Sequence, residues 1–314
     1  MSEIIDQIIS IGFFAAMIRV ATPLLFATLG EMFAERSGVL NLGIEGIMLL
    51  GAMTGFTAAY FSGSLWVGIA AAAATGAAFG ALMGLLTVSL GLSQHVSGLG
   101  VTLLCSGLAF FFYRLVFGQP SQPPSVEAFH TQPIPFLADI PGLGPVLFNQ
   151  FSLVYLAFLL VPVSAYLLYR TPWGLNLRTV GENPYAAVSA GVSVAAMRYQ
   201  GLIIAGMLMG VGGAYLSTAG FNAFTFGVVS GRGWVCIALV VLGQWDPWRS
   251  AVAALLFGGV EALGLRLQSS GAIDVPYQLF LMLPFVVTIV AMAVLARSAR
   301  APTALLVPFR REER

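Results

Sequence analysis

The stretch from Trp66 to Leu90 reads WVGIAAAAATGAAFGALMGLLTVSL and holds no charged residue. A bilayer core about 30 Å thick needs about 20 apolar residues in a helix, so this run is long enough to cross it. Gly76, Gly80 and Gly84 recur every four residues within it, and small residues at this spacing let membrane helices approach closely. The stretch therefore predicts a transmembrane helix packed tightly within a bundle.

Similar apolar stretches run along the whole chain. Of its 314 residues, 58% are hydrophobic and 9% are charged, and the mean hydropathy is +0.91, whereas a soluble domain carries about 25% charged residues. The surplus apolar surface must face membrane lipid. The predicted fold is all-α, a single polytopic membrane helix bundle over residues 1–314. We expect about nine spans, at 8–30, 38–61, 66–90, 97–118, 151–169, 199–219, 233–244, 250–268 and 277–296, of which the seventh is short enough to be a half-helix or a re-entrant element.

Arginine placement orients this bundle. With nine spans and the C-terminus inside, ten arginines fall on one side and three on the other, while Arg19 lies within the first span. Basic residues favour cytoplasmic loops, so we assign the arginine-rich side to the cytoplasm and the N-terminus to the outside. This orientation predicts a cytosolic loop at 170–198, a cytosolic tail at 297–314 and an external loop at 119–150. The external loop is rich in proline and suits either a lid or docking surface or a passive re-entry segment.

The residue types exclude several classes of function. All fourteen basic residues are arginine, so the chain lacks the lysine that a P-loop or a pyridoxal Schiff base requires. Its two histidines and two cysteines show no spacing typical of a zinc site, and a formal net charge of +1 gives no indication of a nucleic-acid partner. We expect no enzyme activity, no metal and no cofactor. If ATP drives the protein, another chain must hydrolyse it.

The cytosolic loop contains the signals of a short helix. Asn183 can cap a helix start, and Pro184 suits the first helical position. Ala186 and Ala187 favour helix, and Gly191 can adopt the left-handed conformation that ends one. We predict a helix of roughly two turns that docks into a groove on another protein; the alternative is a surface turn.

A few polar residues fall at membrane depth, where burial is costly and usually marks function. Asn41 and Glu45 lie near the cytosolic end of the second span. Glu45 could take part in transport, bond neighbouring backbone, or pair with Arg19 or Arg36. A further group recurs along one broad side of the fourth span: Gln94, Ser97, Thr102 and Ser106. These side chains could line a water-filled path or bond neighbouring helices.

Four regions together resemble a known family. They are FAERSGVLNLGIEGIMLLGA (33–52), IPGLGPVLF (140–148), GENPYAAVSAG (181–191) and the segments SGRGW, LGQWDP and FGGVEA within 230–262. In this order they resemble the permease subunits of bacterial ABC importers, in the branch that serves branched-chain amino acids, ribose, other simple sugars and nucleosides. The resemblance runs from about residue 12 to 296. It is closest to the nucleoside and simple-sugar members.

The resemblance implies a type II importer fold in the bacterial inner membrane, with the path formed between two permeases. The implied partners are an ABC ATPase with two nucleotide-binding cassettes, a second and different permease, and an extracytoplasmic binding protein. Nucleoside-type relatives often have asparagine where this chain has Thr102, which leaves the purine or nucleoside assignment open. By the same resemblance, the cytosolic loop engages the ATPase through Gly181, Glu182, Asn183, Pro184, Ala186, Ala187 and Gly191.

We therefore predict a permease subunit that conducts a nucleoside or simple sugar. Its translocation path is expected near Asn41, Glu45, Gln94, Ser97, Thr102 and Ser106. The competing hypothesis is a secondary carrier that couples transport to protons through Glu45 or Glu261. Carriers usually place such groups at the bilayer midplane, near broken helices of two related halves. Glu45 lies closer to the cytosolic edge, and a carrier has no need of a coupling loop.

Overall fold

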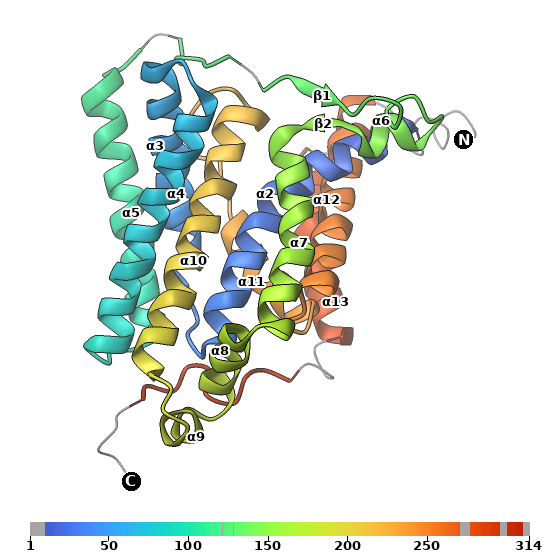
Figure 1. The fold of residues 1–314 in the computed structure, drawn as a ribbon. Coiled ribbons are helices and arrows are strands. Elements are labelled where there is room, and N and C mark those ends of the chain that lie inside the picture. Colours follow the sequence, from blue (N-terminus) through green and yellow to red (C-terminus); the bar gives the residue numbers. More distant parts are fainter. Residues whose placement is uncertain (1–9, 121, 128, 271–276, 296–299, 310–314) are drawn as a thin grey trace.

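The computed structural model describes residues 10–120, 122–127, 129–270, 277–295 and 300–309. Within these residues the chain forms a bundle of helices that run roughly side by side (Figure 1). In chain order the elements are α2 (Ile11–Arg36), α3 (Ile44–Ser62), α4 (Leu65–Gly84), the π-helical turn η1 (Leu85–Ser89), α5 (Gln94–Phe117), β1 (Thr131–Pro133), α6 (Leu143–Leu147), β2 (Asn149–Phe151), α7 (Ser152–Arg170), α8 (Pro172–Glu182), α9 (Pro184–Ser189), α10 (Val194–Tyr215), the π-helical turn η2 (Leu216–Gly220), α11 (Arg232–Leu242), α12 (Pro247–Ser270) and α13 (Tyr277–Leu295).

Seven of these helices are long and apolar enough to cross a membrane: α2, α3, α4 with η1, α5, α7, α10 with η2, and α12. The predicted seventh span is indeed short, since α11 has 11 residues. In α13 the apolar stretch is Met282–Val294. The nine predicted spans thus correspond to seven helices of crossing length and two shorter apolar ones. The helical fold class is confirmed, with one small addition, because β1 and β2 pair antiparallel in the loop between α5 and α7.

The start predicted for the second span is wrong. The expected helix from 38 begins only at Ile44, because the preceding segment Ser37–Gly43, which we call the linker, is not helical. The amide of Ser37 bonds to α2 carbonyls, and Gly38 then takes a φ of +90°, which turns the chain away from the helix axis. The linker runs back along α2, since the amide of Asn41 donates to the carboxylate of Glu31 at 2.9 Å.

The most buried span is α10, which packs against α2, α3 and α4. Glycines make these contacts close, as the spacing of Gly76, Gly80 and Gly84 predicts. A Cβ at Gly76 would collide with the backbone of Gly206, and one at Gly51 would meet the backbone of Gly210. By contrast, α5 stands at the edge of the bundle (Figure 1). Only 22% of its most apolar 18-residue stretch is buried.

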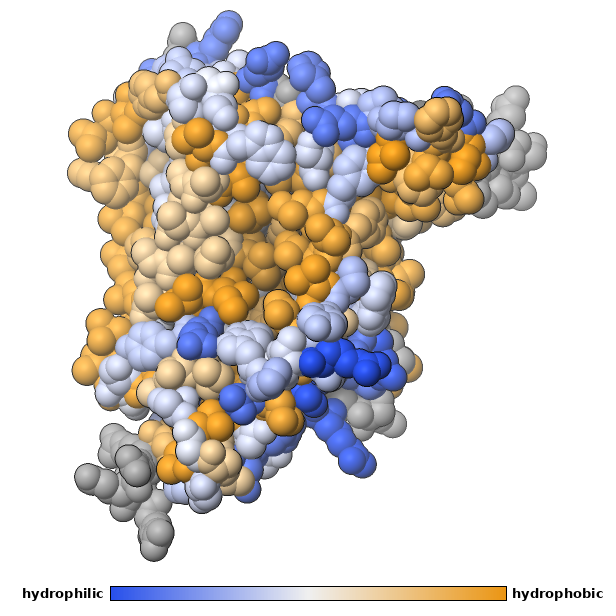
Figure 2. Space-filling model, in the orientation of Figure 1, coloured by the Kyte–Doolittle hydropathy of each residue, from blue (hydrophilic) through white to orange (hydrophobic). Residues whose placement is uncertain are grey.

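Two polar ends enclose an apolar middle. Figure 2 shows a broad hydrophobic band across the visible face of the molecule, with hydrophilic residues gathered above and below it. The loop 119–150 lies at one end, together with the start of α2, while α8, α9 and residues 300–309 lie at the other (Figure 1). The two loops therefore lie at opposite ends of the bundle.

Candidate coupling and translocation sites

The loop 170–198 forms two helices rather than one. The predicted helix is present as α9: the side chain of Asn183 accepts from the amide of Ala186 at 3.0 Å, and Pro184 takes the first helical position. The preceding helix, α8, was missed. Its signal is the same, because Thr171 caps the helix from Pro172 by accepting from the amide of Gly174.

The residues assigned to ATPase coupling do not share one exposed surface. Ala186 is exposed on α9, whereas Ala187 is fully buried against Val180 and Val194. Gly181 is buried as well, where a Cβ would collide with the carbonyl of Arg36 at the end of α2. The exposed part of α9 is therefore the surface that remains open to a partner, while the buried residues fasten the α8–α9 pair to the bundle.

Residues 300–309 lie across this pair of helices. The carboxylate of Glu182 accepts from the amide and hydroxyl of Thr303 at 3.2 and 3.0 Å, and Ala304 donates to the carbonyl of Gly181 at 2.8 Å. Phe309 packs against the ring of Tyr185 at 5.2 Å. The described part of the predicted tail thus forms part of the same surface as α9, which no sequence pattern indicated.

The polar side of α5 faces the linker. The side chain of Gln94 accepts from the amide of Leu40 at 2.8 Å and donates to the carbonyl of Gly38 at 3.4 Å. The hydroxyl of Thr102 donates to the carbonyl of Leu42 at 2.9 Å. Non-helical backbone at membrane depth is tolerated only where the protein satisfies its polar groups. Gln94 and Thr102 supply those partners.

Of the remaining members of the predicted path, Asn41 lies in the linker itself, and Ser97 and Ser106 lie on α5. Asn41 and Ser97 are buried, and Ser106 is half-buried on α5. The side-chain oxygen of Asn41 accepts from the amide of Gly43, which directly precedes α3. On the opposite side of α5, Val96 is 71% exposed, as the predicted polar and apolar sides require.

The pairing of Glu45 with Arg19 or Arg36 is wrong. Its two carboxylate oxygens accept from the amides of Gly231 and Gly233, each at 2.8 Å, at the start of α11. A helix N-terminus presents unpaired amides and a partial positive charge, so a carboxylate is well placed there. The two arginines bond elsewhere: Arg19 donates to Gln150, and Arg36 donates to the carbonyl of Trp245.

The second carboxylate of the carrier hypothesis also has a partner. Glu261 on α12 forms an ion pair with Arg232, the first residue of α11. Both Glu45 and Glu261 therefore hold the start of this short helix in place. No local sequence pattern indicates these contacts, because the partners lie 186 and 29 residues away along the chain.

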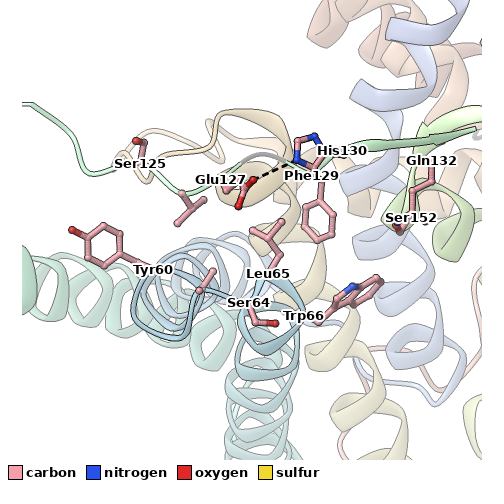
Figure 3. Close-up of a pocket in the computed structure, with 13 residues that line it drawn as sticks. Tyr60, Ser64, Leu65, Trp66, Ser125, Glu127, Phe129, His130, Gln132 and Ser152 are labelled. Atoms are coloured by element: carbon pink, nitrogen blue, oxygen red, sulfur yellow. Dashed lines mark hydrogen bonds and ion pairs between the residues drawn. The ribbon is translucent and has the colours of Figure 1, made fainter.

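A pocket of about 490 Å³ opens at the end of the molecule that carries the loop 119–150. It lies between the turn that joins α3 to α4 and the loop residues Ser125, Glu127, Phe129 and His130 (Figure 3). Trp66 packs edge-on against Phe129 at 5.9 Å, with Tyr60 nearby. The imidazole of His130 lies 3.5 Å from the carboxylate of Glu127. The pocket thus offers aromatic faces and polar groups together.

Comparison with known proteins identifies the family. Residues 13–292 match the model described as branched-chain amino acid transport system / permease component. The chain belongs to this family. It is a permease subunit of an ABC importer and a multi-pass protein of the inner membrane.

Three relatives are informative. The guanosine ABC transporter permease protein NupQ of Bacillus subtilis is 36% identical over 97% of this chain and 98% of its own length. TsgC13 of Haloferax volcanii, provisionally named as a glucose ABC transporter permease, is 42% identical over 82% of this chain and 78% of its own. The guanosine ABC transporter permease protein NupP of Bacillus subtilis is 27% identical over 80% of this chain and 74% of its own.

Replacing Glu45 with alanine should loosen the start of α11. The amides of Gly231 and Gly233 would lose their acceptor, and each buried unsatisfied group costs about 1–3 kcal/mol. We expect a lower melting temperature for purified Glu45→Ala and an intermediate value for Glu45→Gln, which keeps one acceptor oxygen. Glu127→Ala, at an exposed carboxylate, is the control. A Glu45→Ala protein as stable as this control would contradict the capping role.

Proposed function

We propose that this permease conducts a nucleoside, with a simple sugar as the second candidate. The similarity to NupQ supports the first, because it extends over nearly the full length of both chains. The similarity to TsgC13 supports the second, with higher identity over a shorter region. Thr102 bonds the linker backbone, so its difference from nucleoside-type relatives fits a structural substitution as well as a change of cargo.

We propose further that the permease works beside a second, different permease. NupQ and NupP are both named guanosine ABC transporter permease proteins and come from one organism, and this chain resembles both. A pair of unlike permeases is the simplest arrangement consistent with two such relatives. The partner chains would be an ABC ATPase at the α8–α9 end and an extracytoplasmic binding protein at the opposite end, beside the aromatic pocket.

The six path residues would hold neighbouring backbone segments in place, in addition to lining the path. Gln94 and Thr102 bond the linker from α5, and Asn41 bonds Gly43 within it. Glu45 bonds the start of α11. The linker and the stretch that leads into α11 are both non-helical. We propose that they form the wall past which the cargo moves, with Ser97 and Ser106 on the neighbouring face of α5.

Reconstitution tests the proposed function. Liposomes should contain the permease, a second permease and the ATPase. They should take up labelled guanosine only when ATP and the binding protein are present. Labelled glucose is tested in the same way, as the second candidate cargo. The lone chain should take up neither under a proton gradient, because Glu45 and Glu261 are held by structural partners. Gradient-driven uptake by the lone chain would overturn the importer assignment and restore the carrier.

Coupling through α9 is tested at its exposed residue. Ala186→Arg should leave membrane insertion and melting temperature unchanged, because this side chain is exposed. Substrate-stimulated ATP hydrolysis of the assembled complex should fall at least about tenfold, since an arginine would lose its hydration in the contact with the ATPase. Gln122→Arg, exposed at the opposite end, should hydrolyse normally. Normal stimulation in Ala186→Arg would mean that α9 is not the contact.

A further inference from the structure

Two glutamates near the end of α2 have no place in the function described so far. Glu31 and Glu35 lie four residues apart on α2, so their side chains project from the same face of the helix. They are 0% and 1% exposed. Two buried carboxylates side by side are costly unless a cation or a proton compensates them.

Each carboxyl group has one oxygen that is bonded and one that is not. One oxygen of Glu31 accepts from the amide of Asn41 at 2.9 Å, and one oxygen of Glu35 accepts from the indole nitrogen of Trp245 at 2.6 Å. Within the described part of the chain, the other two oxygens are buried and have no hydrogen-bond donor.

No cation neutralises the pair among the described residues. Arg36, the next residue on α2, donates to the carbonyl of Trp245 and to the hydroxyl of Tyr169. Arg198 on α10 donates to the carbonyl of Val307. Of the charged groups on the neighbouring helices, Glu45 bonds the amides at the start of α11, and Arg232 pairs with Glu261.

We propose that Glu31 and Glu35 share one proton, carried by Glu31, and that this pair positions the two non-helical segments beside it. The hydrogen on the free oxygen of Glu31 would point at the free oxygen of Glu35. A single hydrogen then provides a partner for both unbonded oxygens. Glu35 is the ionised member, because the Trp245 indole donates to it at a shorter distance than the donor to Glu31.

The pair joins segments that are distant in the sequence. Glu31 holds the linker through the amide of Asn41. Glu35 holds the turn between α11 and α12 through Trp245, which has a φ of +55° and follows Gln244 at +54°. Such backbone is strained for residues other than glycine and needs surrounding contacts to persist. The end of α2 also meets Gly181 of α8. The two glutamates therefore lie between helices α8 and α9 on one side and the linker and the turn between α11 and α12 on the other.

Glutamine substitutions test the proposal in the assembled transporter. Glu31→Gln keeps an acceptor for Asn41 and a donor toward Glu35, so uptake should stay within about twofold of the unsubstituted protein. Glu35→Gln removes the charged acceptor of the Trp245 indole, and uptake should fall about tenfold or more, because a hydrogen bond to a charged group is stronger than one to a neutral amide. Equal effects of the two substitutions, or the reverse order, would overturn the assignment.

Infrared spectroscopy of the purified full chain provides a readout that does not depend on cargo or partners. The difference spectrum between the unsubstituted protein and Glu31→Gln should contain the C=O band of a protonated carboxylic acid that shifts in D₂O. Glu127→Gln, at an exposed carboxylate, should lack this difference. The unsubstituted protein should also lose thermal stability as the pH rises and the shared proton leaves, whereas Glu31→Gln should not. Absence of the carboxylic acid band from the difference spectrum would overturn the proposal even if uptake is normal.

Discussion

Backbone amides and carbonyls at membrane depth must find partners within the protein, and this requirement shapes the whole bundle. The chain leaves the helical conformation in the linker between α2 and α3, and again before the short helix α11. Polar side chains from three helices bond these segments: Glu31 of α2, Glu45 of α3, and Gln94 and Thr102 of α5. The polar residues of a largely apolar sequence are therefore concentrated where the helices are interrupted.

This requirement has a consequence for transport. A side chain that bonds the backbone of a broken segment is less available to bind cargo, but it determines where that segment lies. The α8–α9 pair contacts the linker directly, because Gly181 packs against Arg36 and Gly38, and Arg36 in turn bonds the turn after α11 at Trp245. The arrangement suits a permease that opens and closes a path while other subunits supply energy and select the cargo.

Much of the fold could be predicted from local sequence. Long apolar runs identify the seven crossing helices, the glycines at 76, 80 and 84 predict the close approach of α4 to α10, and Asn183 with Pro184 predicts α9. These signals work because each depends on residues that are near one another in the chain. The missed helix α8 carried such a signal too, in Thr171 and Pro172.

The partners of the buried polar residues could not be predicted in this way. For Glu45 the sequence left backbone and arginine partners open, and its partners are the distant amides of Gly231 and Gly233, which no sequence pattern identifies. The start of α3 was misplaced because Val39, Leu40 and Leu42 of the linker read as the beginning of the apolar run that continues into α3. Likewise, Ala187 was assigned to ATPase coupling, but it is buried against Val180 and Val194.

Hydrogen–deuterium exchange of the purified protein tests the central claim most directly, which is that side chains hold the broken segments as firmly as helical bonds would. The amides of Leu40, Asn41, Gly231 and Gly233 should exchange as slowly as those in the middle of α10, and Glu45→Ala should speed exchange at the two glycines alone. Rapid exchange at these four amides in the unsubstituted protein would contradict the account.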